Sequence, residues 1–410
     1  MSAPPAAVRS RMSAAWRSPN AKDGLLTVAL LAASVAPLLL APVRARWLGP
    51  DDRGTFALFQ SSIALVAAAS MLGIRHAAYS FGPEGPRRLP MPVLACSLLA
   101  GLLAAAPLAL LALHRGQQAI ATVLVFSVVL APLWASYQLE VADAGMTRDR
   151  RGLAALTSGP PLVDLLLTGV LVLARTLTLT ATVAVALAVE LARALVTVVR
   201  SWRRRGPTTI RRYPGGQFVR EALTHTPGSL LPQVAMHVDI VVYAALVPSA
   251  LLGIYAVSRI GMLLVVPVTL ALEGRVVRMA QERGVRRAVL FSAAVGAGLL
   301  VLVAPPGALL IPTVFGEEYA AAAVAFVAMM AAGAIRCFTT LVAASAAGLG
   351  MAAPASVQAG VHLLAAAAAA AAVAALPGTP VVELMAAGTL VAQTIGSAAM
   401  LITLRRSRRL

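Results

Sequence analysis

Charge, aromatic side chains and cysteine are all scarce in this sequence. Of the 410 residues, 12% are charged, 5% are aromatic and two are cysteines, Cys96 and Cys337. Two cysteines cannot form a disulfide framework, so the fold does not depend on one. A water-soluble domain carries charge on about a quarter of its residues, so this low share argues against a soluble protein.

Catalytic motifs are missing as well. The sequence has no histidine and cysteine cluster at metal-ligand spacing, no glycine-rich phosphate loop and no Ser/His/Asp set in a recognisable context. A membrane-bound glycan polymerase or ligase would need larger outer loops than those predicted, which cover 44–54, 114–118, 175–176, 312–319 and 377–380. We therefore predict that the protein is not an enzyme and that it binds no cofactor and no metal.

Long hydrophobic runs, in contrast, are abundant. Hydrophobic residues make up 59% of the chain, and the mean hydropathy is +0.84. A helix needs about 20 apolar residues to cross a bilayer, and its backbone groups must bond within the segment. Twelve windows meet this length, so we predict an all-α integral membrane protein; they are 23–43, 55–79, 91–113, 119–143, 154–174, 177–199, 222–247, 249–272, 288–311, 320–346, 354–376 and 381–404.

Positive charge alternates along the chain. The sequence has 34 Lys and Arg against 16 Asp and Glu, a net charge of +18. With a cytoplasmic N-terminus, 26 of the 34 basic residues fall in inner segments and three within helices; the outer segments hold Arg44, Arg46, Arg53, Arg115 and Arg175. This positive-inside distribution predicts a multi-pass protein with an even number of helices and both termini in the cytoplasm. It also indicates contact with anionic lipid heads and no binding of nucleic acid.

A shift of 199 residues superimposes the predicted helices of one half on those of the other, and places Gly54 on Gly253. Each half has six helices, an even number, so both halves begin on the same side of the membrane. We therefore predict two six-helix bundles related by a pseudo-twofold axis along the membrane normal. The predicted divisions are a disordered basic arm at 1–21, an N-terminal bundle at 22–199, a basic linker at 200–220, a C-terminal bundle at 221–404 and a basic tail at 405–410.

One predicted hairpin places an acid and an arginine inside the membrane. Residues 231–261 form two apolar runs around Pro248 and Ser249, with Asp239 ten residues before position 249 and Arg259 ten after it. At about 1.5 Å per residue, each lies about 15 Å from the turn, near the middle of the bilayer. Unpaired charges there are costly, so both should face each other, a partner helix or a wet cavity. A structural ion pair and a cavity-lining site both fit this spacing.

Residues near this hairpin and in the first half resemble a transporter family. LGPDDRGTFALFQ at 48–60, LGI at 72–74, LP at 231–232, VDIVVYAAL at 238–246 and LGIYAVSRIG at 252–261 are similar to motifs of the polysaccharide-transporter branch of the multidrug/oligosaccharidyl-lipid/polysaccharide flippase superfamily. The resemblance implies two bundles around a central cavity that carry a lipid-linked oligosaccharide, or a related polysaccharide precursor, to the outer leaflet of the cytoplasmic membrane. The bias toward Ala, Arg and Pro is typical of a high-GC bacterial genome. After Asp23 at its start, the predicted first helix lacks charge, unlike the branch that flips peptidoglycan precursor.

Such a substrate carries a diphosphate, which arginine binds through paired hydrogen bonds. We therefore predict Arg259, Arg336 and Arg75 as phosphate ligands, although Arg75 could instead extend to the membrane interface. Asp239 and Asp164 are predicted to hold these cations in the empty site, or to carry a coupling proton or sodium ion. The polar stripe that contains Asp164 could instead serve helix packing.

Two other functions stay open. An ion-coupled drug or metabolite antiporter of the same superfamily would need a buried acid, which Asp164 or Asp239 supplies, but not several arginines. A scaffold for glycan-assembly enzymes would use the basic segment 200–220 to bind them.

Overall fold

The computed structural model describes residues 21–81, 89–147, 149–203, 215–348, 353–376 and 380–406, and every regular element in these ranges is a helix. The first half contains α2 (Ala21–Met71), α3 (Ile74–Phe81), α4 (Met91–His114), α5 (Gln118–Ser127), η2 (Val128–Leu130), α6 (Ala131–Met146), α7 (Arg150–Leu173) and α8 (Leu179–Arg203). The second half contains α9 (Gly215–Leu246), α10 (Ser249–Ser258), α11 (Ile260–Leu263), α12 (Val265–Arg283), α13 (Val285–Phe315), η3 (Glu317–Tyr319), α14 (Ala322–Gly348), α15 (Ala353–Ala375) and α16 (Val381–Arg406). The all-α prediction is confirmed.

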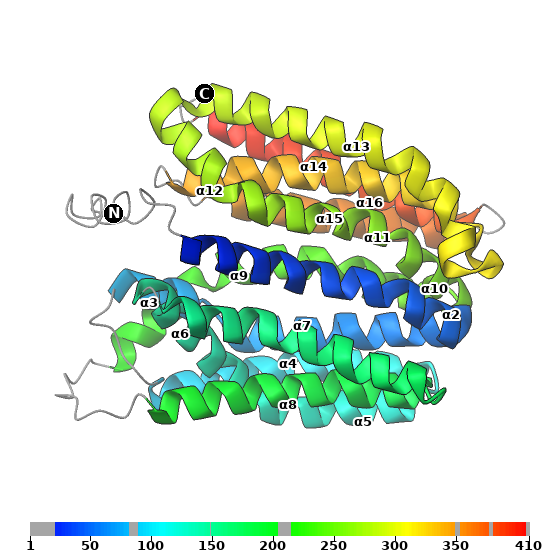
Figure 1. The fold of residues 1–410 in the computed structure, drawn as a ribbon, viewed down its shortest axis with the longest axis horizontal. Coiled ribbons are helices and arrows are strands. Elements are labelled where there is room, and N and C mark those ends of the chain that lie inside the picture. The colour runs from blue at the N-terminus through cyan, green and yellow to red at the C-terminus, as the bar shows by residue number, and fades with distance from the viewer. Residues whose placement is uncertain are drawn as a thin grey trace.

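Within the described residues, 11 helical segments are long and apolar enough to cross a membrane. The first, Val35–Phe81, includes a kink in α2, because the chain turns at Gly49, whose φ of 68° and ψ of 174° are not helical. Glycine adopts positive φ without the steric cost that a side chain would impose. In Figure 1, α2 accordingly runs to one end of the molecule and returns. Counting its two arms separately gives the twelve predicted spans.

The helices lie in two groups with their long axes nearly parallel. Figure 1 shows α12 to α16 in the upper group and α4 to α8 in the lower one, with the first arm of α2 and α9 between them. The start of α2 and the end of α16 lie at one end, which we call the terminal end. The opposite end, called the hairpin end, carries the turns at Gly49, Gly116, Pro248 and Gly316.

The two groups meet through equivalent glycines. A Cβ atom built on Gly54 would lie 1.9 Å from the carbonyl oxygen of Ser249, and one built on Gly253 would lie 1.9 Å from that of Pro50. Gly54 and Gly253 differ by 199 positions, as do Pro50 and Ser249, so the contact is reciprocal about the predicted pseudo-twofold axis. The two-bundle architecture agrees with the prediction; the exact domain limits 22–199 and 221–404 stay predictions.

Several helix boundaries differ from the predicted ones. The window 55–79 is interrupted between α2 and α3, where Leu72 has a φ of 46°. Helix α8 continues to Arg203 and α9 begins at Gly215, so both helices extend into the segment 200–220 that was predicted as a linker. Arg200, predicted to lie in this linker, instead pairs from α8 with Glu140 at 3.1 Å and with Asp149 at 2.6 Å. The predicted arm lies outside the described residues except for Ala21, as does the tail beyond Arg406.

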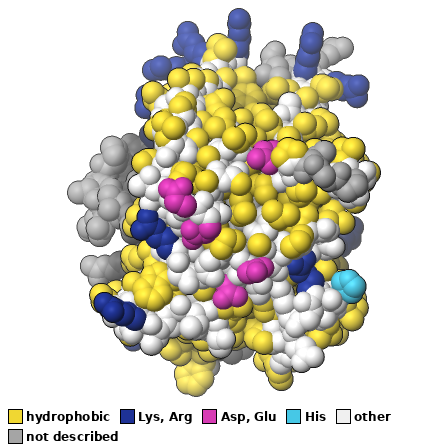
Figure 2. Space-filling model, turned by 90° about the vertical axis from the view of Figure 1, so that its right-hand side faces the viewer, with side chains coloured by type: hydrophobic (Ala, Val, Ile, Leu, Met, Phe, Trp, Pro, Cys, Tyr) yellow, Lys and Arg dark blue, Asp and Glu magenta, His cyan; other side chains and the backbone are white. Residues whose placement is uncertain are grey.

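The surface of the hairpin end is acidic at its centre. Figure 2 views the molecule from this end and shows carboxylate side chains gathered near the middle of the face. Exposed acids in the turns of this end are Asp51, Asp52, Glu317 and Glu318. The arginines Arg203, Arg283 and Arg406 end their helices at the opposite, terminal end.

Candidate functional site

The predicted pair of Asp239 and Arg259 forms inside the second bundle. Asp239 lies on α9, and Arg259 lies at the junction of α10 and α11, on the other side of the turn at Pro248. Arg259 Nε is 2.9 Å from Asp239 Oδ2, and the two residues are only 8% and 6% exposed. The Nε group is not aligned for a hydrogen bond, and Arg259 Nη2 instead donates to the carbonyl oxygen of Met236. The contact is therefore a buried ion pair with a separate main-chain anchor.

Two tyrosines support the carboxylate of Asp239. The buried Tyr255 donates its hydroxyl hydrogen to Asp239 Oδ2 at 2.7 Å, and its Oη also lies 2.8 Å from Thr389 Oγ1. Tyr243 packs edge-on against Tyr255, with ring centroids 5.3 Å apart, and donates to the carbonyl of Met385 at 3.2 Å. Asp239 Oδ1 is buried without a hydrogen-bond partner. One carboxylate oxygen is thus fixed while the other can accept a proton or a donor.

Arg336 is the second predicted phosphate ligand, and the structure brings it near the pair. It lies on α14, is partly buried, and is close enough to interact electrostatically with both Arg259 and Asp239. Among the described side chains no acid forms an ion pair with Arg336. Asp239 therefore faces two guanidinium groups and can neutralise only one.

Asp164 has a different partner from the one predicted. On α7 it pairs with Nη2 of Arg44, which also donates to Thr168 Oγ1 at 2.9 Å. The prediction placed Arg44 in an outer loop, but the first arm of α2 continues beyond residue 43 and buries Arg44 to 4% exposure. The expectation of an uncharged first helix was wrong for the same reason. Asp164 thus compensates Arg44 and not Arg259.

Arg53 is a buried cation that the sequence analysis missed. Only 8% of the residue is exposed, and its Nε and Nη1 atoms are buried without a hydrogen-bond partner. Its guanidinium carbon lies 5.8 Å from the ring centroid of Phe56, and that of Arg44 lies 5.2 Å from the same centroid. Arg53 is also close enough to Arg44 and Arg259 to be repelled by both. It follows a turn motif, LGPDD, which made an outer-loop position the natural interpretation of its sequence context.

Arg75, the third predicted phosphate ligand, lies elsewhere. It is exposed on α3, where its Nε bonds Tyr79 Oη at 3.3 Å and its guanidinium covers the Tyr79 ring at 5.8 Å. α3 lies at the terminal end, whereas Arg259 is about 15 Å along its helix from the hairpin end. This placement agrees with the alternative that Arg75 extends to the membrane interface.

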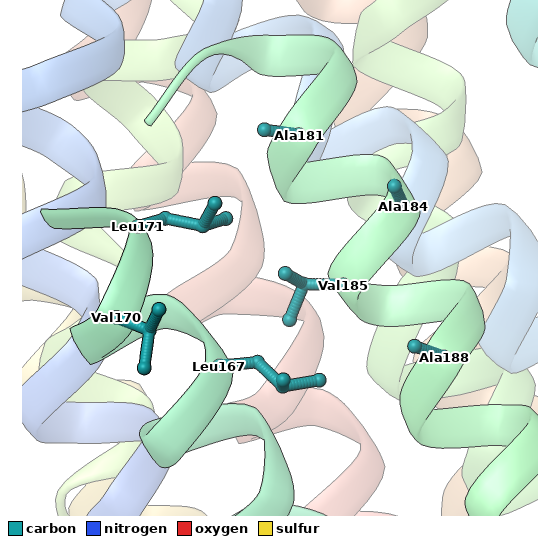
Figure 3. Close-up of a pocket in the computed structure, with 7 residues that line it drawn as sticks. All are labelled: Leu167, Val170, Leu171, Ala181, Ala184, Val185 and Ala188. Atoms are coloured by element: carbon teal, nitrogen blue, oxygen red, sulfur yellow. The ribbon is translucent and has the colours of Figure 1, made fainter. Parts of the chain in front are cut away.

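An apolar groove opens between α7 and α8. Figure 3 shows side chains of both helices facing one another across it; its lining residues are Leu167, Val170, Leu171, Ala181, Ala184, Val185 and Ala188. None of the predicted site residues lines this groove. Its composition matches a surface that faces lipid tails, so the polar chemistry of the protein lies elsewhere.

Comparisons with known proteins identify the fold. No protein-family model matches the chain, and no curated protein matches its sequence. An inward-facing multidrug resistance MATE family transporter of the MOP superfamily superposes with a TM-score of 0.60 at 15% identity over 99% of both chains. The lipid II flippase MurJ, in an inward closed conformation, gives 0.62 at 12% identity over 93% of this chain and 87% of that one. A mutant of the Vibrio cholerae MATE transporter VcmN gives 0.54 at 15% identity over 98% of both. The chain therefore has the fold that MATE transporters and MurJ share.

Proposed function

We propose that the protein carries an anionic, lipid-linked substrate across the membrane by alternating access. A lipid-linked oligosaccharide, or a related polysaccharide precursor, has the required diphosphate and lipid tail. The observation that carries this proposal is Arg53, a buried guanidinium with two unpartnered nitrogens beside the ion pairs of Arg44 and Arg259. An uncompensated buried charge is costly, so its retention favours a ligand that supplies the opposite charge.

The balance of buried charge fits a diphosphate. Asp164 neutralises Arg44 and Asp239 neutralises Arg259, whereas no described acid pairs with Arg53 or Arg336. This leaves two positive charges in excess. A diphosphate supplies at least two negative charges and accepts the paired hydrogen bonds that guanidinium groups donate. Arg53 thus joins Arg259 and Arg336 as a proposed ligand in place of Arg75.

The proposed orientation of the protein in the membrane rests on the distribution of its basic residues. Basic segments at the terminal end fit a cytoplasmic location, which leaves the hairpin end outside the cytoplasmic membrane of a bacterium. These basic segments would contact anionic lipid heads, and they offer a surface to glycan-assembly enzymes. Transport would consist of rocking of the two bundles around the arginines, with the lipid tail remaining in the bilayer.

Flipping in proteoliposomes tests the assignment. A polyprenyl-diphosphate lipid with a fluorescent headgroup is incorporated, and its transfer is followed by dithionite quenching. We expect Arg53→Ala and Arg259→Ala each to slow transfer at least about tenfold, because each removes charge-assisted bonds to phosphate. Arg175→Ala removes the same charge from an exposed turn of the hairpin end and should transfer lipid normally. Normal transfer by both site variants, at equal protein levels, would refute the phosphate site.

A second candidate is an ion-coupled drug or metabolite antiporter. The buried, unpartnered Oδ1 atom of Asp239 favours it, since such an oxygen can take up a coupling proton. Asp164 is less suited to this role because its side chain is 19% exposed and has no oxygen that is buried without a partner. Efflux of a cationic dye driven by a pH gradient, lost in Asp239→Asn but kept in Arg53→Ala, would select the antiporter over the lipid transporter.

A further inference from the structure

Two helices end at the hairpin end, and a carbonyl group in the last turn of each accepts a hydrogen bond from the other half. In a regular helix, the carbonyl of Ala244 would accept from residue 248, but that residue is Pro248, which has no N–H group. Ala45 lies in the last turn before Gly49, whose φ of 68° and ψ of 174° end the first arm of α2. Ala45 and Ala244 differ by 199 positions, so they occupy equivalent places in the two halves.

A side chain from the opposite half satisfies each of these carbonyls. Arg115, in the turn after α4, donates from Nη1 to the carbonyl oxygen of Ala244 and, at 2.8 Å, to that of Val247. Its Nη2 donates to Ser249 Oγ at 2.8 Å. Tyr319, in the turn after α13, donates from Oη to the carbonyl oxygen of Ala45 at 3.1 Å. Both donors come from the turn between the third and fourth membrane helices of their own half.

The backbones of the two halves also touch at this end. The reciprocal contact of Gly54 with Gly253 leaves no room for a side chain between the hairpins. Tyr319 is fully buried, as is Ala45, so the bond between them is shielded from water. Arg46 adds one more cross-half bond, to the carbonyl oxygen of Thr313. The hairpin end is therefore closed by bonds that join the two halves.

We propose that Arg115 and Tyr319 form a paired latch that holds the hairpin end closed, and that the hydrogen bonds of both residues must break when this end opens. The inference rests on the proposed alternating-access transport, in which the hairpin end opens to release the substrate. It does not depend on which substrate is carried. The carbonyl of Ala244 has no helical partner, because residue 248 is proline, so breaking its bond to Arg115 exposes an acceptor that only water or a new donor can satisfy.

The two halves of the latch differ in strength. Arg115 makes three hydrogen bonds with a charged donor, whereas Tyr319 makes one with a neutral hydroxyl. Bonds from charged donors are stronger, so Arg115→Ala should favour opening more than Tyr319→Phe does. We expect the ratio of open to closed hairpin ends to rise at least about tenfold in the first variant and about threefold to tenfold in the second. The double variant should show the product of the two factors, because Arg115 and Tyr319 share no hydrogen-bond partner.

Cysteine labelling measures this ratio without substrate. Cys96 and Cys337 are changed to Ser, and Ala41→Cys places a thiol on the first arm of α2, where Ala41 is buried against the second half. A sulfonated maleimide, added to the protein in nanodiscs, reacts with it only after the end opens. The labelling rate therefore follows the open population. Tyr319→Phe retains the buried ring, so it keeps the test valid if Arg115→Ala folds poorly.

A matched control removes a cross-half bond at the other end. Gly73 N donates to Thr226 Oγ1 at 3.1 Å near the terminal end, so Thr226→Ala weakens the contact between halves without touching the latch. It should label at the wild-type rate. The latch is overturned if Arg115→Ala and Tyr319→Phe label at the wild-type rate, or if Thr226→Ala labels as fast as they do. The two proposals can also fail separately. If Arg115→Ala and Tyr319→Phe label faster while Arg53→Ala and Arg259→Ala transfer lipid normally, the latch is supported and the phosphate site is rejected.

Discussion

The substitution Asp239→Asn tests how much the central ion pair stabilises the fold. Asparagine keeps the shape of the side chain and can still accept from Tyr255, which bonds the carboxylate at 2.7 Å. What is lost is the negative charge opposite Arg259. The variant therefore leaves Arg259 buried and uncompensated, with Arg336 nearby to add repulsion.

The size of the stability loss in Asp239→Asn follows from the burial of the pair. The side chains of Arg259 and Asp239 are 10% and 6% exposed, so solvent screens the pair weakly. Removing one partner of such a pair costs about 3–5 kcal/mol, because the remaining charge is left without compensation. With an unfolding entropy of about 2.1 cal/mol/K per residue, a loss of about 4 kcal/mol lowers the melting temperature of a chain of this length by about 5 °C.

A less deeply buried pair in the first bundle provides the control. Glu190 and Arg193 lie 3.1 Å apart on α8, with side chains 15% and 25% exposed. Gln at position 190 can still accept from Trp134 Nε1, which bonds Glu190 at 2.7 Å. Helix pairs of this spacing contribute about 0.2–0.5 kcal/mol, so Glu190→Gln should melt within about 1 °C of the wild type.

Thermal unfolding in detergent, followed by size-exclusion chromatography of the heated protein, measures both variants. Adding Arg259→Gln to Asp239→Asn should recover much of the lost stability, since no charge then stays buried alone. If Asp239→Asn has the same melting temperature as the wild type and the control, the pair contributes nothing to stability and the reasoning fails. The exchanged pair Asp239→Arg with Arg259→Asp should restore folding but not transport, whereas restored transport would make the pair purely structural.

Two further predictions concern the hairpin end. Gly253→Ala should destabilise the protein by about 1–3 kcal/mol, because the added Cβ would overlap the Pro50 carbonyl. The control Gly228→Ala should not destabilise it, because the atom nearest to the added Cβ lies 3.7 Å away. Equal melting temperatures of the two variants would contradict the close contact between Gly253 and Pro50. Burial raises the pKa of Tyr319 above its ordinary value of 10, with Arg53 opposing and Glu318 reinforcing the shift. The stability that this hydroxyl contributes is present below pH 10 and is lost as the pH rises toward the raised pKa. The free energy of unfolding should therefore fall more at alkaline pH in the wild-type protein than in Tyr319→Phe. Parallel curves of unfolding free energy against pH would contradict this prediction.

The sequence alone predicted the helices and one contact. Hydropathy determines where a chain can cross a membrane, and helical hydrogen bonds form within each segment, so both are readable from local sequence. Asp239 and Arg259 could be paired because a single turn at Pro248 fixes their depth on adjacent helices. The offset of 199 positions identified Gly54 and Gly253 as equivalent positions of the two halves, whereas their contact was found only in the structure.

Only the tertiary structure decided which other charges are buried and what they contact. Arg44 and its partner Asp164 are 120 positions apart, and Tyr319 and its acceptor Ala45 are 274 apart, so no local pattern connects them. Arg53 follows a turn motif typical of exposed loops, yet packing between the halves buries it. Local sequence sets the length and depth of each helix, whereas the rotation and approach of neighbouring helices decide which arginines lose contact with water.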